Sequence, residues 1–213
     1  MTDKRVLALL YPGCIGYEIQ LALEVASRVA GVETAAPERG LVALGNGLRA
    51  HADLAIAEID PARYDAVIVP GGDPEVLIEN DLASAPLRAL DAKGALIAAI
   101  CAGPLVLAKA GVLRGRRFTH GYGAFHRTLL APFWEGARYE DAHVVEDGTL
   151  ITAQPQGTIE LAIRFASRLG ALEDDDEARY RARYARGEVS MRESMERAVR
   201  RGALDAAALD PEA

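Results

Sequence analysis

Cysteine is scarce in this sequence, with only two among 213 residues. Cys14 and Cys101 lie far apart and cannot form a framework of several disulfides. No run of about 18 uncharged apolar residues occurs, so we expect no membrane span. The apolar run behind the charged start is too short for a signal peptide, and no small-residue cleavage site follows it. These absences predict a cytoplasmic protein with reduced thiols.

The sequence also lacks a large excess of charged residues of one sign. The chain has 24 basic and 31 acidic residues, mixed along the sequence, for a net charge of -7. This balance argues against partners such as nucleic acid or an anionic membrane. Hydrophobic residues make up 50% of the chain, which is enough to bury one good core.

Short apolar runs alternate with helical patterns, which predicts a parallel sheet covered on both faces. We expect an α/β fold, a three-layer sandwich whose ligands bind beyond the carboxyl ends of the strands. Glycines at Asn46–Gly47 and Asp147–Gly148 predict two hairpins. The predicted strands cover residues 5–10, 64–72, 94–100, 115–120 and the second hairpin at 142–153, and the predicted helices cover 17–29 and 158–169.

The composition changes after Gly170, where arginine, acidic residues and alanine dominate. We therefore divide the chain into an α/β domain at residues 1–170 and a charged helical C-terminal extension at residues 171–213. The extension reads as two helices. The second would carry Met191, Met195 and Val199 on one stripe.

Cys101 ends the apolar run "LIAAIC" and is followed at once by Ala102, Gly103 and Pro104. A sharp strand-to-helix turn here would place the sulfur at a helix N-terminus, where free N–H groups stabilise a thiolate and lower its pKa. This is the nucleophile-elbow arrangement with sulfur in place of a serine oxygen. The spacing fits a buried structural cysteine equally well.

Backbone donors for an oxyanion are expected beside this sulfur. Gly71 and Gly72 end another apolar strand, and a glycine lets its N–H face a bound oxygen. The N–H groups of Gly72 and Ala102 could form an oxyanion hole, with Gly71 as a further possible member. An ordinary strand-to-helix turn would use the same glycines.

An acid or base is also needed. His120 ends the strand predicted at 115–120, which a right-handed crossover would return to the sheet beside Cys101. His126 is the second choice. Glu18, early in the first helix, could be protonated beside a thiolate and donate a hydrogen bond to it. Cys14 follows the first strand and could form a disulfide with an oxidised Cys101.

These motifs together resemble the ThiJ/PfpI superfamily. "AAICAGPLVLAKAGVLRGRRFTH" follows "VIVPGG" and precedes "GTLITAQPQGTIELAI", in the family's order and spacing over roughly residues 4–170. The resemblance is strongest to the branch that contains the Parkinson-disease-associated protein. It implies a flavodoxin-like sandwich and a homodimer that needs no cofactor and no metal. It also implies that Cys101 is the nucleophile, aided by Glu18, His120 and the backbone of Gly72 and Ala102.

Departures from the family pattern narrow the function. Ala102 stands where the protease-like branch has histidine, which argues against a peptidase. Ala102 and Glu18 argue against the isonitrile-hydrating branch. The resemblance then implies an enzyme for small reactive carbonyl compounds, a glutathione-independent glyoxalase or deglycase that converts an α-oxoaldehyde to a 2-hydroxy acid. Two alternatives stay open: a non-enzymatic redox-sensing stress protein or chaperone, and an amide or isonitrile hydrolase or hydratase.

Overall fold

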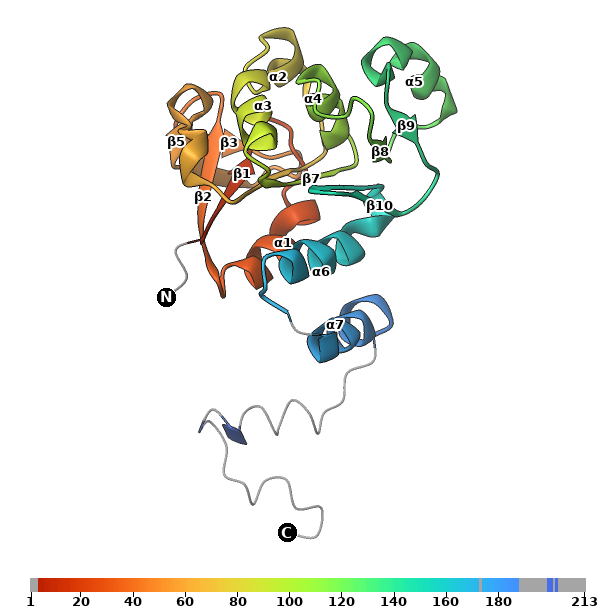
Figure 1. Cartoon of the computed structure of the whole chain (residues 1–213). Helices are drawn as coiled ribbons and strands as arrows, with labels where there is room; N and C mark the ends of the chain where they lie inside the picture. Colours follow the sequence, from red (N-terminus) through yellow and green to blue (C-terminus); the bar gives the residue numbers. More distant parts are fainter. Residues whose placement is uncertain (1–3, 173, 188–198, 201, 203–213) are drawn as a thin grey trace. The chain divides into compact units, whose positions relative to one another are not determined.

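A seven-stranded sheet forms the centre of the fold (Figure 1). The computed structural model describes residues 4–172, 174–187, 199–200 and 202. The strand order is β10-β11-β7-β6-β1-β2-β5, in which β10 is antiparallel to β11 and all other neighbours are parallel. The strands are β1 (Lys4–Leu9), β2 (Ala30–Ala36), β3 (Gly40–Ala43), β4 (Arg49–Ala52), β5 (Leu54–Ala55), β6 (Ala66–Val69), β7 (Leu96–Ile100), β8 (Arg117–Phe118), β9 (Arg138–Tyr139), β10 (Val144–Asp147) and β11 (Leu150–Ala153).

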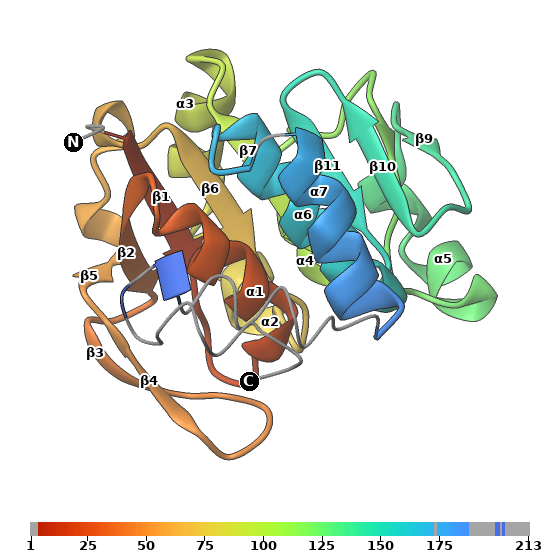
Figure 2. The ribbon, with the colours of Figure 1, turned by 90° about the horizontal axis from the view of Figure 1, so that it is seen from below.

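Helices cover both faces of this sheet. Helices α1 and α6 pack together on one face, and α2, α3 and α4 lie on the other (Figures 1 and 2). The expected α/β sandwich with a mainly parallel sheet is therefore confirmed. The helices are α1 (Tyr17–Ala26), α2 (Glu75–Glu79), α3 (Ser84–Ala92), α4 (Gly103–Lys109), α5 (Ala124–Leu129), α6 (Thr158–Arg168) and α7 (Asp174–Tyr180), with short 3₁₀ turns at Ile56–Glu58, Pro61–Arg63, Ala131–Trp134 and Pro155–Gly157 and a π turn at Arg181–Ala185.

The central strands are apolar along their whole length because both of their faces are covered. Every residue of β6 and β7 is buried, and so are the last four residues of β1. These three strands are neighbours and run parallel. Their carboxyl ends therefore meet at one rim of the sheet, where the chain turns away after each strand.

Both predicted hairpins are present. Strand β3 pairs antiparallel with β4, and β10 pairs with β11. Gly47 and Gly148 turn these hairpins with φ of 83° and 64°, a conformation that glycine adopts without steric cost.

The strand predicted at 115–120 does not join the main sheet. Within this segment only Arg117 and Phe118 form a strand, β8, which pairs with β9 in a separate two-stranded sheet. Strand β11 pairs with β7 in its place. The reason is burial: all four residues of β11 are buried, whereas Arg117 in β8 is exposed. The route by which we expected His120 to approach Cys101 is therefore wrong. The segment still reaches the rim, because the Gly121 N–H donates to the Cys101 carbonyl oxygen at 2.7 Å.

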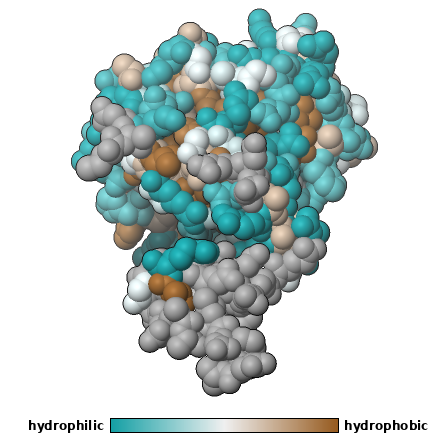
Figure 3. Space-filling model, turned by 60° about the horizontal axis from the view of Figure 1, so that its bottom comes forward, coloured by the Kyte–Doolittle hydropathy of each residue, from teal (hydrophilic) through white to brown (hydrophobic). Residues whose placement is uncertain are grey.

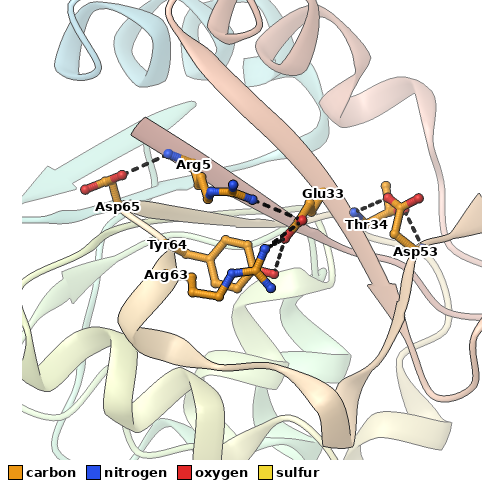
Figure 4. Close-up of polar contacts among 7 residues, drawn as sticks. All are labelled: Arg5, Glu33, Thr34, Asp53, Arg63, Tyr64 and Asp65. Carbon is orange, nitrogen blue, oxygen red and sulfur yellow. Dashed lines mark hydrogen bonds and ion pairs between the residues drawn. The ribbon is translucent and has the colours of Figure 1, made fainter. Parts of the chain in front are cut away.

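A polar network around Glu33 ties β1, β2 and the turn before β6 together at the other end of the sheet (Figure 4). The Glu33 carboxylate accepts hydrogen bonds from Arg5 at 3.2 Å, Arg63 at 3.0 Å and the Tyr64 hydroxyl at 2.5 Å. Burial, together with the bond to Glu33, raises the pKa of Tyr64 to about 12. Tyr64 thus stays a neutral donor to a charged acceptor, which is a strong kind of hydrogen bond.

The chain divides into two compact units, and the second begins at Asp174. Helix α7 and the π turn after it belong to this second unit. The second predicted helix of the extension, with Met191 and Met195, lies outside the described residues.

On the face shown in Figure 3, hydrophilic residues cover most of the described surface, and apolar residues form smaller patches between them. Within the part of the chain that the structure describes, no helix combines the length and the apolar character needed to cross a bilayer.

Candidate active site

Cys101 occupies a sharp turn between β7 and α4. Its φ of 59° lies in the left-handed region, which is a strained conformation for a residue with a side chain. Gly103 makes the turn possible, because a Cβ there would lie 2.6 Å from the Val69 carbonyl oxygen. Pro104 fits the first turn of α4, where no intrahelical N–H partner is required. The geometry is that of a nucleophile elbow.

The carboxyl of Glu18 lies beside this sulfur. Glu18 is the second residue of α1 and is only 1% exposed. The Gly71 N–H donates to its Oε2 at 2.8 Å, while its Oε1 has no hydrogen-bond partner among the described residues. A Cβ at Gly71 would lie 2.5 Å from Cys101 Cβ and 2.7 Å from Glu18 Oε2. Gly71 therefore leaves just enough room for the thiol and the carboxyl to meet.

Two backbone N–H groups face the sulfur. Those of Gly72 and Ala102 hydrogen-bond to the Cys101 side chain and favour its charged form. Gly72 has a φ of 113°, and a Cβ there would lie 2.4 Å from the Gly13 carbonyl oxygen, so only glycine fits. The structure thus brings together Cys101, Glu18 and both residues expected to form an oxyanion hole.

The pKa of the Cys101 thiol is raised in the folded protein, whereas the sequence predicts a lowered pKa. Burial, followed by the charge of Glu18 and a hydrogen bond with it, raises the pKa of Cys101 to about 11. The two N–H groups oppose this rise but are outweighed, so the expected lowering of the pKa is wrong. Burial also raises the pKa of Glu18. The pair therefore competes for a single negative charge, and a proton on either group favours the anion on the other.

His120 lies in an aromatic cluster and not in a hydrogen bond with the thiol. Its ring centroid is 4.8 Å from that of Trp134 and 4.7 Å from that of Tyr139, and it is 2% exposed. Burial lowers the pKa of His120 to about 4, so the ring is neutral at pH 7. Its Nδ1 accepts the Tyr122 N–H at 3.1 Å. The proton of the neutral ring is thus on Nε2, which makes that nitrogen a donor.

His126 and Cys14 are the two remaining candidates that the sequence suggested for this site. His126 lies on the exposed helix α5, where its ring contacts those of Tyr122 and Phe125. Cys14 is fully buried and is a free thiol whose pKa is raised by burial. Its Cα lies 2.7 Å from the place where a Cβ on Gly72 would be, so Cys14 packs behind the oxyanion turn.

Two tyrosines near the thiol were missed from sequence. The hydroxyl of Tyr11 donates to the carbonyl oxygens of Pro70 at 2.8 Å and Gly71 at 2.9 Å. Burial and the nearby charge of Cys101 raise the pKa of Tyr122 to about 12. Tyr11 continues an apolar run and is indistinguishable there from a core residue. Tyr122 lies in "HGYGAFH", which has no periodic pattern to mark it.

The described ranges contain no group of three or more histidine, cysteine or acidic side chains placed to hold a metal ion. The groups that meet beside Cys101 at this rim are its thiol, the Glu18 carboxyl and backbone amides.

A parallel α/β sandwich with a cysteine at a strained strand-to-helix turn defines a class of proteins with a cysteine nucleophile elbow. The chain belongs to the DJ-1/PfpI family, whose sequence pattern matches residues 4–168.

Individual relatives agree with this assignment. Protein dj-1beta of Drosophila melanogaster is 33% identical over 176 residues, which cover 80% of this chain and 92% of the relative. A deglycase of Thermococcus kodakarensis is 35% identical over 129 residues, 60% of this chain and 75% of the relative. The crystal structure of Drosophila DJ-1beta superposes with a TM-score of 0.71 at 30% identity, covering 85% of this chain and 96% of the other.

Proposed function

We propose that the protein is a cysteine enzyme that acts on small reactive carbonyl compounds, as a glutathione-independent glyoxalase or a deglycase. The observation that carries this proposal is the meeting of the Cys101 thiol, the Glu18 carboxyl and the backbone N–H groups of Gly72 and Ala102 beside Gly71. A nucleophile, a proton carrier and an oxyanion site are the groups that addition to a carbonyl requires.

The first step is addition of the sulfur to the aldehyde carbon of an α-oxoaldehyde. The S–C bond forms, the thiol proton passes to Glu18, and the aldehyde oxygen takes up the electron pair of the broken C=O π bond. The N–H groups of Gly72 and Ala102 would donate to this oxygen. Glu18 then returns the proton to the oxygen, which gives a hemithioacetal and restores the carboxylate.

The second step is an internal rearrangement. Glu18 removes the hydrogen on the former aldehyde carbon as a proton, and the resulting enediol is protonated at the neighbouring carbon. The product is the thioester of a 2-hydroxy acid. Water then cleaves the thioester, releasing the 2-hydroxy acid and regenerating the thiol. The net reaction adds one water molecule to the oxoaldehyde, with no external oxidant or reductant.

Glu18 suits this shuttle better than His120. Burial raises the pKa of Glu18 and so brings its protonated and charged forms closer in energy at neutral pH. His120 is neutral and its Nδ1 is already an acceptor, so its free Nε2 can donate a hydrogen bond but cannot accept a proton. We therefore assign proton transfer to Glu18 and a donor role to His120.

The relative from Thermococcus kodakarensis is named a deglycase, which supports this substrate class at 35% identity. A deglycase would act on the carbinolamine that an oxoaldehyde forms with an amine. The sulfur displaces the amine from that carbon, the thiol proton passes through Glu18 to the leaving amine, and the same hemithioacetal results. The proposal includes a reducing cytoplasm, because Cys101 must remain a thiol to react. It also includes the homodimer that the family resemblance implies, which sedimentation would test.

A substrate panel tests the proposal. Methylglyoxal, glyoxal, a glycated amine, a simple amide and an isonitrile are offered to wild type, Cys101→Ser and the matched control Cys14→Ser. We expect turnover of an oxoaldehyde that Cys101→Ser abolishes and Cys14→Ser retains. Turnover of the amide or isonitrile alone would point to a hydrolase or hydratase. Oxidation of Cys101 without any turnover would point to a redox sensor.

A further inference from the structure

Tyr11 contacts the site only through the backbone. It follows β1, is fully buried, and directs its hydroxyl at the carbonyl oxygens of Pro70 and Gly71, at 2.8 and 2.9 Å. We propose that Tyr11 is a positioning residue that holds the Gly71 and Gly72 N–H groups on the Glu18 carboxyl and the Cys101 sulfur. The catalytic meaning of this inference rests on the function proposed above.

The argument follows from the planarity of the peptide unit. The Pro70 carbonyl belongs to the same peptide as the Gly71 N–H, which donates to Glu18. The Gly71 carbonyl belongs to the same peptide as the Gly72 N–H, which faces Cys101. Both peptides are trans, so each C=O points away from its own N–H. By binding the two oxygens from behind, one hydroxyl fixes the direction of both donors.

Such an anchor is needed because successive glycines rotate freely. Without Cβ atoms, Gly71 and Gly72 have more accessible backbone conformations than any other pair, and Gly72 is held at a φ of 113°. The Ile15 N–H donates to the Gly71 oxygen at 2.9 Å and is a second anchor on that peptide. For the Pro70 oxygen, Tyr11 supplies the hydrogen bond.

The surroundings keep Tyr11 a donor. Burial and the nearby thiols and carboxyl raise its pKa well above the usual value, so the hydroxyl stays protonated throughout the working range of the enzyme. Donation to a peptide oxygen also polarises the peptide and strengthens its N–H as a donor. Tyr11 would therefore orient the two N–H groups and make them better partners for an anion.

The variant Tyr11→Phe removes the hydroxyl and keeps the ring. The matched control is Tyr64→Phe, which removes another buried hydroxyl whose partner is Glu33, at the opposite end of the sheet. The first readout is the pH dependence of Cys101 alkylation by iodoacetamide, which requires no substrate. We expect the rate at pH 8 to fall roughly three- to tenfold in Tyr11→Phe, because the Gly72 N–H that favours the charged form of Cys101 is no longer held on the sulfur. Tyr64→Phe should keep the wild-type rate.

The second readout is steady-state turnover. We expect kcat for the oxoaldehyde to fall roughly tenfold in Tyr11→Phe with KM changed less than twofold, since the donors act on the adduct and not on the free substrate. An altered alkylation profile with no turnover in any variant would contradict the proposed function and leave the positioning role supported. An alkylation profile equal to that of Tyr64→Phe would overturn the positioning role.

Should Tyr11→Phe fail to fold, a fluorinated tyrosine at position 11 keeps the ring and makes the hydroxyl a stronger donor. The alkylation rate at pH 8 should then rise above that of wild type. An unchanged rate would contradict the inference.

Discussion

Replacing Gly71 by alanine separates the reacting groups directly. The added Cβ would lie 2.5 Å from Cys101 Cβ, 2.7 Å from Glu18 Oε2 and 2.8 Å from Cys101 Sγ. Ordinary van der Waals contact begins at 3.4 Å, so Cys101 must retreat by about 3.4 − 2.5 = 0.9 Å. Cys101 is already at a strained φ of 59°, which limits how the turn can yield.

The expected loss follows from this distance. Misplacing a reacting group by about 1 Å costs on the order of a hundredfold in rate, which is about 2.7 kcal/mol of transition-state stabilisation. Overpacking of a buried site typically costs about 1–3 kcal/mol of folding free energy. We therefore predict that Gly71→Ala folds, is destabilised by roughly that amount, and loses about 99% of its turnover.

The assay pairs oxoaldehyde turnover with denaturant unfolding and brief alkylation of Cys101. Gly31→Ala is the control, because a Cβ at Gly31 on β2 meets nothing within 4 Å. That variant should keep full activity and lose no more than about 0.5 kcal/mol of stability. If Gly71→Ala alkylates and turns over like wild type, the close meeting of Cys101 and Glu18 at this glycine is wrong.

Three further predictions concern the titrating groups. Glu18→Gln removes the charge that raises the pKa of Cys101, so alkylation at pH 7 should speed up while turnover falls; equal alkylation rates would show that the thiol does not feel the carboxylate. His120 has a pKa of about 4 when folded against 6.5 in the unfolded chain, so the unfolded state binds more protons and stability should be lost as pH falls from 6.5 to 4. Unfolding titrations should show this loss, on the order of 3 kcal/mol, in wild type and not in His120→Phe. Peroxide should add two oxygens to Cys101, since Cys14 is fully buried; a loss of two hydrogens in the intact mass would instead reveal a disulfide between them.

The sequence alone determined the class of fold. Short continuous apolar runs such as "AVIV" and "LIAAI", bounded by glycine or proline, predict strands with both faces covered, and these became β6 and β7. It also determined the turns, because glycine and proline punctuate the chain through local sterics. The elbow at Cys101 and the tight approach at Gly72 follow from small residues at the ends of strands.

Tertiary structure decided how those ends combine. The sequence placed "RRFTH" as a strand beside β7, but that position went to β11, which buries all four of its residues. His120 reached the rim by a different path and is buried among aromatic rings, which made it a neutral donor. No local sequence pattern shows which segment pairs with β7, because the outcome depends on whether "RRFTH" or β11 buries more apolar surface there.

The charge on Cys101 was decided in the same way. The sequence predicts a helix N-terminus and hence a lowered thiol pKa, whereas burial and Glu18, distant in sequence, raise it to about 11. The role of Tyr11 could not be predicted from sequence either, since its hydroxyl donates to carbonyl oxygens 59 and 60 residues away. Turns and strands depend on neighbouring residues and can be predicted from sequence. Protonation and hydrogen-bond direction depend on what the fold brings into contact, and only the folded chain determines them.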